Sequence, residues 1–183
     1  MKVKVPGLAD STGVKPMDFT LPASKQGELY TFEIGEVTSK LSERSPCIVN
    51  TFPMVVIDGP IDEKTKKTTQ GRKYTHRINV LLPEHDSYDP ANTRNADELA
   101  DICKAAGVHY DASGYDPEDF AGKRVKTSLG LRKGKDQDGN ERMENSVRQV
   151  KDDDGVTHLW LPDDGKPASR GPKKGTATAG RRR

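Results

Sequence analysis

Hydrophobic and polar residues alternate along residues 73–82, and this alternation predicts a half-buried strand. One side of the segment carries apolar, aromatic and imidazole side chains: Tyr74, His76, Ile78, Val80 and Leu82. The other side carries polar and charged side chains: Lys73, Thr75, Arg77 and Asn79. Residues 124–131 alternate in the same way. Because successive side chains of a strand point to opposite faces, each segment is expected to cover a core with one face and to present cations on the other.

Between these two segments the hydrophobic period changes to that of a helix. Residues 96–106 place their apolar side chains on one helical stripe. This stripe contains Leu99, Ile102, Cys103 and Ala106. Asn95 is expected to cap the N-terminus, with Glu98 as its capping-box partner. Gly107 is expected to end the helix in a left-handed conformation.

Three further segments have the character of strands: residues 28–38, 47–57 and 141–150. The first alternates well, the second is rich in β-branched and aromatic residues, and the third alternates poorly. Pro53 within the second segment requires an edge or a bulge. The resulting order is strand, strand, strand, helix, strand, strand. It predicts a mostly β protein, namely a five-stranded OB-fold Greek-key barrel with one helix between strands three and four.

Composition divides the 183-residue chain into four regions. Residues 1–27 contain several Pro and Gly residues and are expected to form an N-terminal arm, followed by the OB-fold domain at residues 28–150. Residues 151–165 hold five Asp against one Lys, and residues 166–183 hold seven Lys or Arg and no acid. The last region cannot build a core, which predicts a disordered basic C-terminal tail. The net charge of +2 therefore hides an acidic segment followed by a basic one.

The acidic region encloses the only tryptophan of the chain, Trp160, between two leucines at positions 159 and 161. This apolar segment could dock on a partner protein as a short peptide. It could also pack back onto the barrel as an extra strand. The sequence leaves both interpretations open and slightly favours the extra strand.

Several classes of protein have little support in the sequence. No P-loop or G-x-S-x-G motif occurs, and none of the four histidines has a Cys or His at ligand spacing. An enzyme, a cofactor and a metal are therefore not expected. No apolar run reaches roughly 18 residues, so no membrane span is expected. The two isolated cysteines suit reduced thiols and a cytoplasmic location.

Four short motifs occur in an order that resembles a family of bacteriophage proteins related to single-stranded DNA-binding proteins. They are Leu21-Pro22 with residues 27–32; Gly59 with Gly71-Arg72-Lys73; residues 99–108; and residues 119–125 leading to Asn145-Ser146-Val147. The resemblance covers roughly residues 20–150. It implies an OB-fold that binds single-stranded DNA during phage replication or recombination, in the host cytoplasm, with phage or host replication and recombination proteins as further partners. Many such proteins end in an acidic tail that recruits partners, whereas this chain ends in Arg181-Arg182-Arg183.

Candidate nucleic-acid contacts combine cations for phosphates with rings for bases. The candidate cations on strands and loops are Arg72, Lys73, Arg77, Arg124, Lys126, Arg132 and Lys133. The candidate stacking rings are Tyr30, Phe52 and Tyr74. At least one of Phe32 and Phe52 is expected to lie in the core. The basic tail is expected to add phosphate contacts that do not depend on sequence.

These features predict a non-enzymatic protein that binds single-stranded DNA with little sequence preference. Weak base discrimination is expected because no helix rich in Arg, Asn and Gln is available to enter a major groove. The alternative is a protein-binding OB module without DNA affinity, acting as a replication or recombination adaptor or as a virion component. An enzyme, such as a nuclease accessory factor, is the third and least supported interpretation.

Overall fold

A computed structural model of the protein describes residues 20–135 and 139–165. The predicted basic tail and most of the predicted N-terminal arm lie outside these residues. Of the described residues, 43% are in strands and 12% are helical, which confirms the predicted mostly β class. No helix in the described part is long and apolar enough to cross a membrane.

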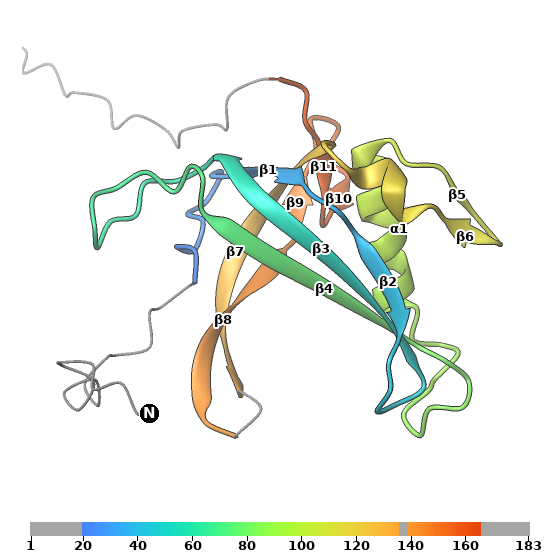
Figure 1. The fold of residues 1–183 in the computed structure, drawn as a ribbon. Coiled ribbons are helices and arrows are strands. Elements are labelled where there is room, and N and C mark those ends of the chain that lie inside the picture. The colour runs from blue at the N-terminus through green and yellow to red at the C-terminus, as the bar shows by residue number, and fades with distance from the viewer. Residues whose placement is uncertain (1–19, 136–138, 166–183) are drawn as a thin grey trace, which may run out of the picture.

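Seven strands form one antiparallel sheet in which the described hydrogen-bonded pairs run β4–β3–β1–β7–β8, with β2 beside β3 and β11 beside β7 (Figure 1). Their bounds are β1 Tyr30–Ile34, β2 Thr38–Leu41, β3 Cys47–Asp58, β4 Lys73–Leu81, β7 Arg124–Lys135, β8 Glu141–Arg148 and β11 Leu161–Pro162. Two small hairpins accompany the sheet: β5 Tyr110–Asp111 with β6 Gly114–Tyr115, and β9 Val150–Lys151 with β10 Thr157–His158. The sheet is not closed into a barrel.

Helix α1 (Arg94–Ala106) lies between β4 and β7 in the chain, as predicted, but its N-terminus differs from the prediction. Thr93 is the N-cap residue, and its side chain makes no capping hydrogen bond. The Asn95 side chain instead donates to the Asn79 carbonyl of β4 at 2.6 Å. The predicted capping box is therefore wrong, because the polar side chains of the first turn are used to attach the helix to the sheet.

The buried stripe and the C-terminus of α1 agree with the prediction. Ile102 and Cys103 are buried in the core. Gly107 ends the helix with φ of +68°, and its N–H donates to carbonyls of the last turn. A left-handed residue at this position favours glycine, which has no Cβ to oppose it. A helix of 3₁₀ type (Pro117–Phe120) then precedes β7.

The segment predicted as one strand at residues 28–38 is divided into two strands. β1 pairs with β7 and the second half of β3, whereas β2 pairs with the first half of β3. Pro53 of β3 lies opposite this division, and its carbonyl accepts a hydrogen bond from the Gly35 N–H at 2.8 Å. The N and O of one strand residue point to the same side, so the missing N–H of Pro53 faces the break between β1 and β2. The sheet therefore accommodates a proline inside a paired strand.

The inner faces of the strands, helix α1 and a tryptophan enclose a core that is rich in aromatic rings. Tyr30 stacks on Phe32 with ring centroids 5.6 Å apart, and Phe32 contacts Tyr74 at 5.3 Å. Phe52 meets Phe120 edge to face at 5.3 Å. Burial of both Phe32 and Phe52 confirms that at least one of them belongs to the core.

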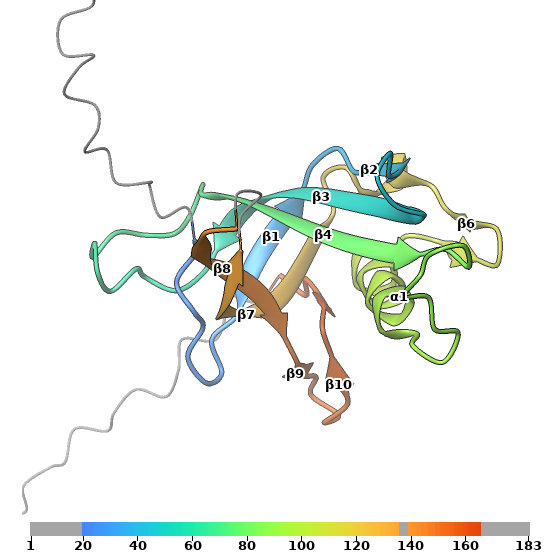
Figure 2. The ribbon, with the colours of Figure 1, turned by 90° about the horizontal axis from the view of Figure 1, so that it is seen from below.

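Residues 157–165, which we call the C-terminal strap, belong to the same folded unit. Leu161 of β11 pairs with Lys126 of β7, and Trp160 is only 1% exposed. This confirms the extra-strand interpretation, and the acidic region at residues 151–165 is therefore packed against the predicted domain. Figure 2 shows the β9–β10 hairpin, whose second strand begins the strap, on the side of the sheet where α1 also lies.

Candidate nucleic-acid interface

The outer face of β3 and β4, continued by β2, is the surface on which this site is built. Cross-strand register places Thr51 opposite Arg77, and Val55 opposite Lys73. Side chains that are directly opposite share a face of the sheet, so the surface can be followed from strand to strand. We call this surface the outer face, and its residues are Thr38, Lys40, Val49, Thr51, Pro53, Val55, Lys73, Thr75, Arg77 and Asn79.

Three cations lie on the outer face, and Glu33 of β1, which lies opposite Val55 on the same side of the sheet, is paired with Arg124. Lys40, Lys73 and Arg77 are all exposed. None of the three forms an ion pair with another residue in the described ranges. Between them lie short, uncharged side chains that allow a ligand backbone to approach the strands. This arrangement favours a polyanion that tracks along the sheet.

The loop between β3 and β4 continues this positive surface past the end of the sheet (Figure 1). Lys64, Lys66 and Lys67 are exposed on it. Its base is fixed by Arg72, which donates to the Asp62 carboxylate at 2.9 Å and holds the pKa of that carboxyl below its usual value. Arg72, predicted as a phosphate contact, therefore has a neighbouring carboxylate as its partner and shapes the loop.

The hairpin of β7 and β8 supplies the predicted loop cations Arg132 and Lys133. Arg132 lies 3.6 Å from Glu144, and Lys133 lies 3.7 Å from Glu141. Both distances are long for an ion pair, and both cations are exposed. Exposed ion pairs of this kind contribute about 0–1 kcal/mol, so a phosphate can compete for either cation.

Lys126 was expected on the exposed side of its strand, and this expectation is wrong. Its side chain is only 7% exposed, because the strap covers it with Asp163 at 3.2 Å and with Asp164. Burial disfavours its charge, yet hydrogen bonds from the ammonium group to both carboxylates raise the pKa of Lys126 above its usual value. The neighbouring Arg124 remains at the surface but is paired with Glu33 at 3.0 Å.

The rings assigned to base stacking point into the core. Tyr30 and Phe52 are 0% exposed, which corrects the prediction that they stack on bases, because a ring with no accessible surface cannot contact a ligand. Tyr74 packs on Phe32, and burial raises the pKa of its hydroxyl. The sequence placed these rings on the hydrophobic side of each strand, and that side proves to be the inner one.

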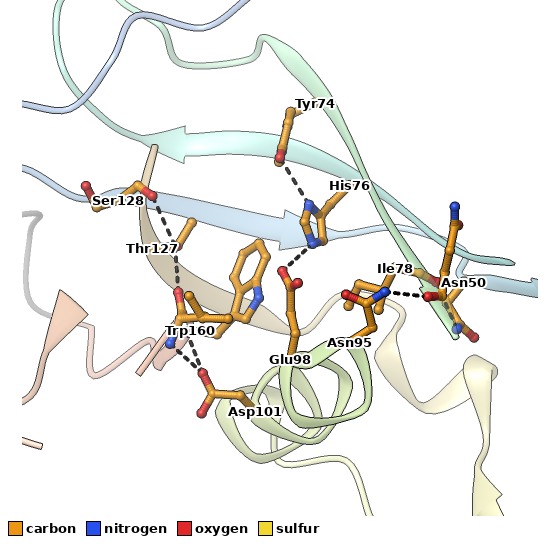
Figure 3. A network of polar contacts seen from close by, with 12 residues as sticks. Asn50, Tyr74, His76, Ile78, Asn95, Glu98, Asp101, Thr127, Ser128 and Trp160 are labelled. Carbon is orange, nitrogen blue, oxygen red and sulfur yellow. Dashed lines mark hydrogen bonds and ion pairs between the residues drawn. The ribbon is translucent and has the colours of Figure 1, made fainter. Parts of the chain in front are cut away.

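A polar network on the inner face of β4 explains how its ring side chains are held (Figure 3). The Tyr74 hydroxyl lies 3.1 Å from His76 Nδ1, and His76 Nε2 lies 2.8 Å from Glu98 of α1. The His76 ring also meets Trp160 edge to face at 5.2 Å. Glu98 therefore joins the helix to the sheet instead of capping the helix.

Asp101 of α1 holds the strap in the same region (Figure 3). Its carboxylate accepts hydrogen bonds from the Leu159 N–H at 2.7 Å and from the Trp160 N–H at 2.8 Å. Its other oxygen lies 3.2 Å from His158 Nδ1. The Thr127 hydroxyl donates to the Leu159 carbonyl at 2.6 Å, so the strap is bonded to both the helix and the sheet.

Sequence reasoning missed Lys40, because this residue lies between the segments predicted as strands at residues 28–38 and 47–57. The strand β2 has only four residues, and all four are exposed, so hydrophobic alternation gives no signal there. The role of Asp101 was also missed, since a polar helix residue gives no indication of the distant backbone that it binds.

Within the part of the chain that the structure describes, no group of three His, Cys, Asp or Glu side chains is arranged to hold a metal ion. A comparison of the sequence with protein-family models found no match, and a comparison with curated proteins found none either.

Proposed function

We propose that the protein binds single-stranded DNA across the outer face of β3 and β4, in support of phage DNA replication or recombination. The observation that carries the proposal is the presence of Lys40, Lys73 and Arg77 on one sheet face, where none of the three forms an ion pair with a described residue. Cations of this kind gain affinity by neutralising phosphates and releasing counterions. Phosphates are common to all sequences, so little base discrimination is expected.

We also propose that the fold is an OB-fold. Its support is the pairing order β4–β3–β1–β7–β8 together with the position of α1 between β4 and β7. In this order β3 and β4 are the second and third main strands. OB-folds bind oligonucleotides on this pair of strands and on the loops that join strands one and two and strands four and five. On this proposal, the outer face corresponds to strands two and three, and the β7–β8 hairpin corresponds to the loop that joins strands four and five.

The test is a titration of a fluorescent oligo-dT strand at several salt concentrations, with wild type and a Lys73→Ala/Arg77→Ala variant. Each phosphate neutralised on a single strand contributes about 0.7 to the slope of log K against log salt, so the double variant should lower the slope by about 1.4. Lys104→Ala is the matched control, since Lys104 is an exposed cation on α1. Wild type that does not bind oligo-dT at low salt would contradict the proposal.

A protein-binding function is the second candidate, and edge strand β2 favours it. β2 pairs only with β3 among the described strands, and all four of its residues are exposed. A free edge can accept an extended peptide from a partner through backbone hydrogen bonds. The same titration separates the two candidates, because a pure protein-binding module would show no salt-dependent affinity for DNA.

A further inference from the structure

The three cations of the outer face are spread along the length of the β3–β4 pair. Lys40 of β2 lies opposite Val49 of β3, and Lys73 of β4 lies opposite Val55. Because a strand rises by about 3.4 Å per residue, these two levels are roughly 20 Å apart along β3. Arg77 lies at a level between them. The cations therefore follow the direction of the strands.

The loop between β3 and β4, residues 59–72, lies at one end of this series of cations, and β2 lies at the other end (Figure 1). The loop contains four cations and two acids. Each acid has a partner, because the Asp62 carboxylate accepts from Arg72 and Glu63 pairs with Lys25. The other loop cations are exposed and form no ion pair with a described residue: Lys64, Lys66 and Lys67. The loop therefore adds cations without carboxylate partners to those of the outer face.

Two buried polar side chains give this loop a defined shape. Asp62 is 8% exposed, and its carboxylate accepts hydrogen bonds from the Lys64 N–H at 3.0 Å and from the Thr65 N–H at 3.3 Å. Thr69 is fully buried, and its hydroxyl donates to the Pro60 carbonyl at 2.8 Å. A loop that is already held in one conformation loses less conformational entropy on binding, which favours affinity.

Lys66 has a backbone conformation that disfavours a lysine. Its φ is +56°, in the left-handed region where glycine and asparagine are preferred. Its N–H donates to the Asp62 carbonyl at 2.7 Å, and the Asp62 N–H donates to the Lys67 carbonyl at 2.9 Å, so the turn is closed on both sides. A strained residue that is held by its surroundings is a common feature of ligand-binding segments.

Exposed apolar side chains accompany these cations. Val55, opposite Lys73 on the outer face, is 37% exposed, and Ile61 at the start of the loop is 64% exposed. A single strand of DNA presents both phosphates and the apolar faces of its bases. The combination of cations and apolar side chains therefore fits a single strand better than a ligand that offers negative charge alone.

The adjoining part of the sheet, formed by β1 and the part of β7 that pairs with it, is less suited to a polyanion. On the same side of the sheet it carries Glu33 on β1, with Arg124 and Lys126 on β7. Arg124 pairs with Glu33, and Lys126 is covered by two carboxylates of the strap. Both cations of β7 therefore have carboxylate partners, whereas the outer-face cations and the three loop lysines have none among the described residues.

We infer that a bound single strand runs lengthwise along β3 and β4 and continues onto the lysines of the β3–β4 loop, instead of crossing the sheet towards β7. The inference rests on the proposed function and adds to it the direction of the strand and a second group of contacts. The three outer-face cations contact the part of the backbone that lies on the sheet. The three loop lysines contact the part that passes beyond its end.

The first test removes loop charges and measures the affinity for a fluorescent oligo-dT strand at several salt concentrations. Lys64→Gln/Lys67→Gln should lower the slope of log K against log salt by about 1.4, since each phosphate contact contributes about 0.7. Lys66 is left in place because of its backbone conformation. Lys104→Gln/Lys151→Gln removes the same charge from exposed positions on α1 and β9, on the other side of the sheet, and should leave the slope unchanged.

The second test asks whether the strand crosses the sheet. Glu33→Gln/Arg124→Gln leaves the net charge of the protein unchanged and removes the ion pair that a crossing strand would meet. A lengthwise strand predicts the same salt slope as wild type. A fall of about 0.7 or more in this variant would mean that the strand contacts Arg124, and it would overturn the inference.

Acetylation of wild type provides a measurement that needs no variant: saturating oligo-dT should make Lys64 and Lys67 less reactive. If Lys73→Ala/Arg77→Ala lowers the salt slope but the loop variant does not, the inference is wrong and the proposed function stands. An equal fall in the Lys104→Gln/Lys151→Gln control would also overturn the inference, because the effect would then reflect total charge. Wild type that does not bind oligo-dT at low salt would contradict the proposed function itself.

Discussion

The two faces of β4 have opposite surroundings, although their residues alternate along one strand. On the outer face, Lys73 and Arg77 are exposed and have no ion pair with a described residue. On the inner face, Tyr74 and His76 are fixed by a hydrogen-bond chain that ends on Glu98 of α1. The inner face holds the helix and the strap in place, and the outer face is left available for a ligand.

Strand β7 shows why alternation alone does not identify a binding face. Lys126 occupies the same kind of position as Arg77, on the polar side of a strand. It is nevertheless buried, because β11 pairs beside it and brings Asp163 and Asp164 over its ammonium group. Alternation therefore gives the direction of a side chain, whereas exposure depends on which distant segment packs over it.

Removal of the Trp160 side chain, which packs against the inner face of β4, should have the largest effect on stability. Trp160→Ala empties a site that is 1% exposed and contacts the His76 ring. Substitutions of this kind lower the free energy of unfolding by about 3–5 kcal/mol, which urea denaturation would measure. Val156→Ala, in an exposed turn, should stay within about ±0.5 kcal/mol. If the two variants were equally stable, the strap would not belong to the core.

Removal of the Asp101 carboxylate should have the next largest effect. Asp101→Ala leaves the Leu159 and Trp160 N–H groups without their acceptor. Loss of a partly buried acceptor should cost about 1 kcal/mol or more, and hydrogen exchange at these two amides should accelerate. Asp153→Ala in the exposed turn is the control. Unchanged exchange at both amides would mean that Asp101 does not hold the strap.

The pH dependence of stability should reveal the His158 contact. Hydrogen bonds with Asp152 and then with Asp101 raise the pKa of His158 above its usual 6.5. Because the folded state binds the proton more tightly, this contribution is fully present below pH 6.5 and is lost as the pH rises through the folded pKa. The stability difference between wild type and His158→Gln should therefore shrink with rising pH. A difference that is constant from about pH 5 to about pH 9 would contradict this assignment.

Changes at the outer face should have the smallest effect on stability. Arg77→Ala should change the free energy of unfolding by no more than about 0.5 kcal/mol, since its side chain is exposed and unpaired within the described structure. Lys126→Ala should destabilise the protein more, because it leaves two strap carboxylates without their cation. Thermal unfolding of both variants checks this order. The reverse order would show that the faces of the two strands are assigned incorrectly.

Local patterns predicted those elements whose structure depends on local sequence. The period of two gave both faces of β4, and the period of 3.6 with Gly107 gave the buried stripe and the end of α1. The errors concern residues with distant partners. Asn95 and Lys126 bind segments 16 and 38 residues away, and such contacts leave no periodic signal.

The same limit applies to the candidate site. Of the predicted contacts, Lys73 and Arg77 lie exposed on one face, and the hydrophobic rings Tyr30 and Phe52 lie inside. The alternation of hydrophobic and polar residues that predicted the strands also predicts that their aromatic residues are buried. The expectation that these rings stack on bases conflicted with this alternation. Lys40 was missed because a strand of four exposed residues has no apolar face.

Lysine footprinting in the presence of DNA tests the central claim most directly. Lysines are acetylated with and without saturating oligo-dT, and the modified positions are measured by mass spectrometry. The account predicts that DNA protects Lys40 and Lys73 on the outer face but leaves the reactivity of Lys104 on α1 unchanged, with Lys126 unreactive in both states. Protection of Lys104 without protection of Lys40 and Lys73 would contradict the assignment of the outer face as the DNA-binding surface.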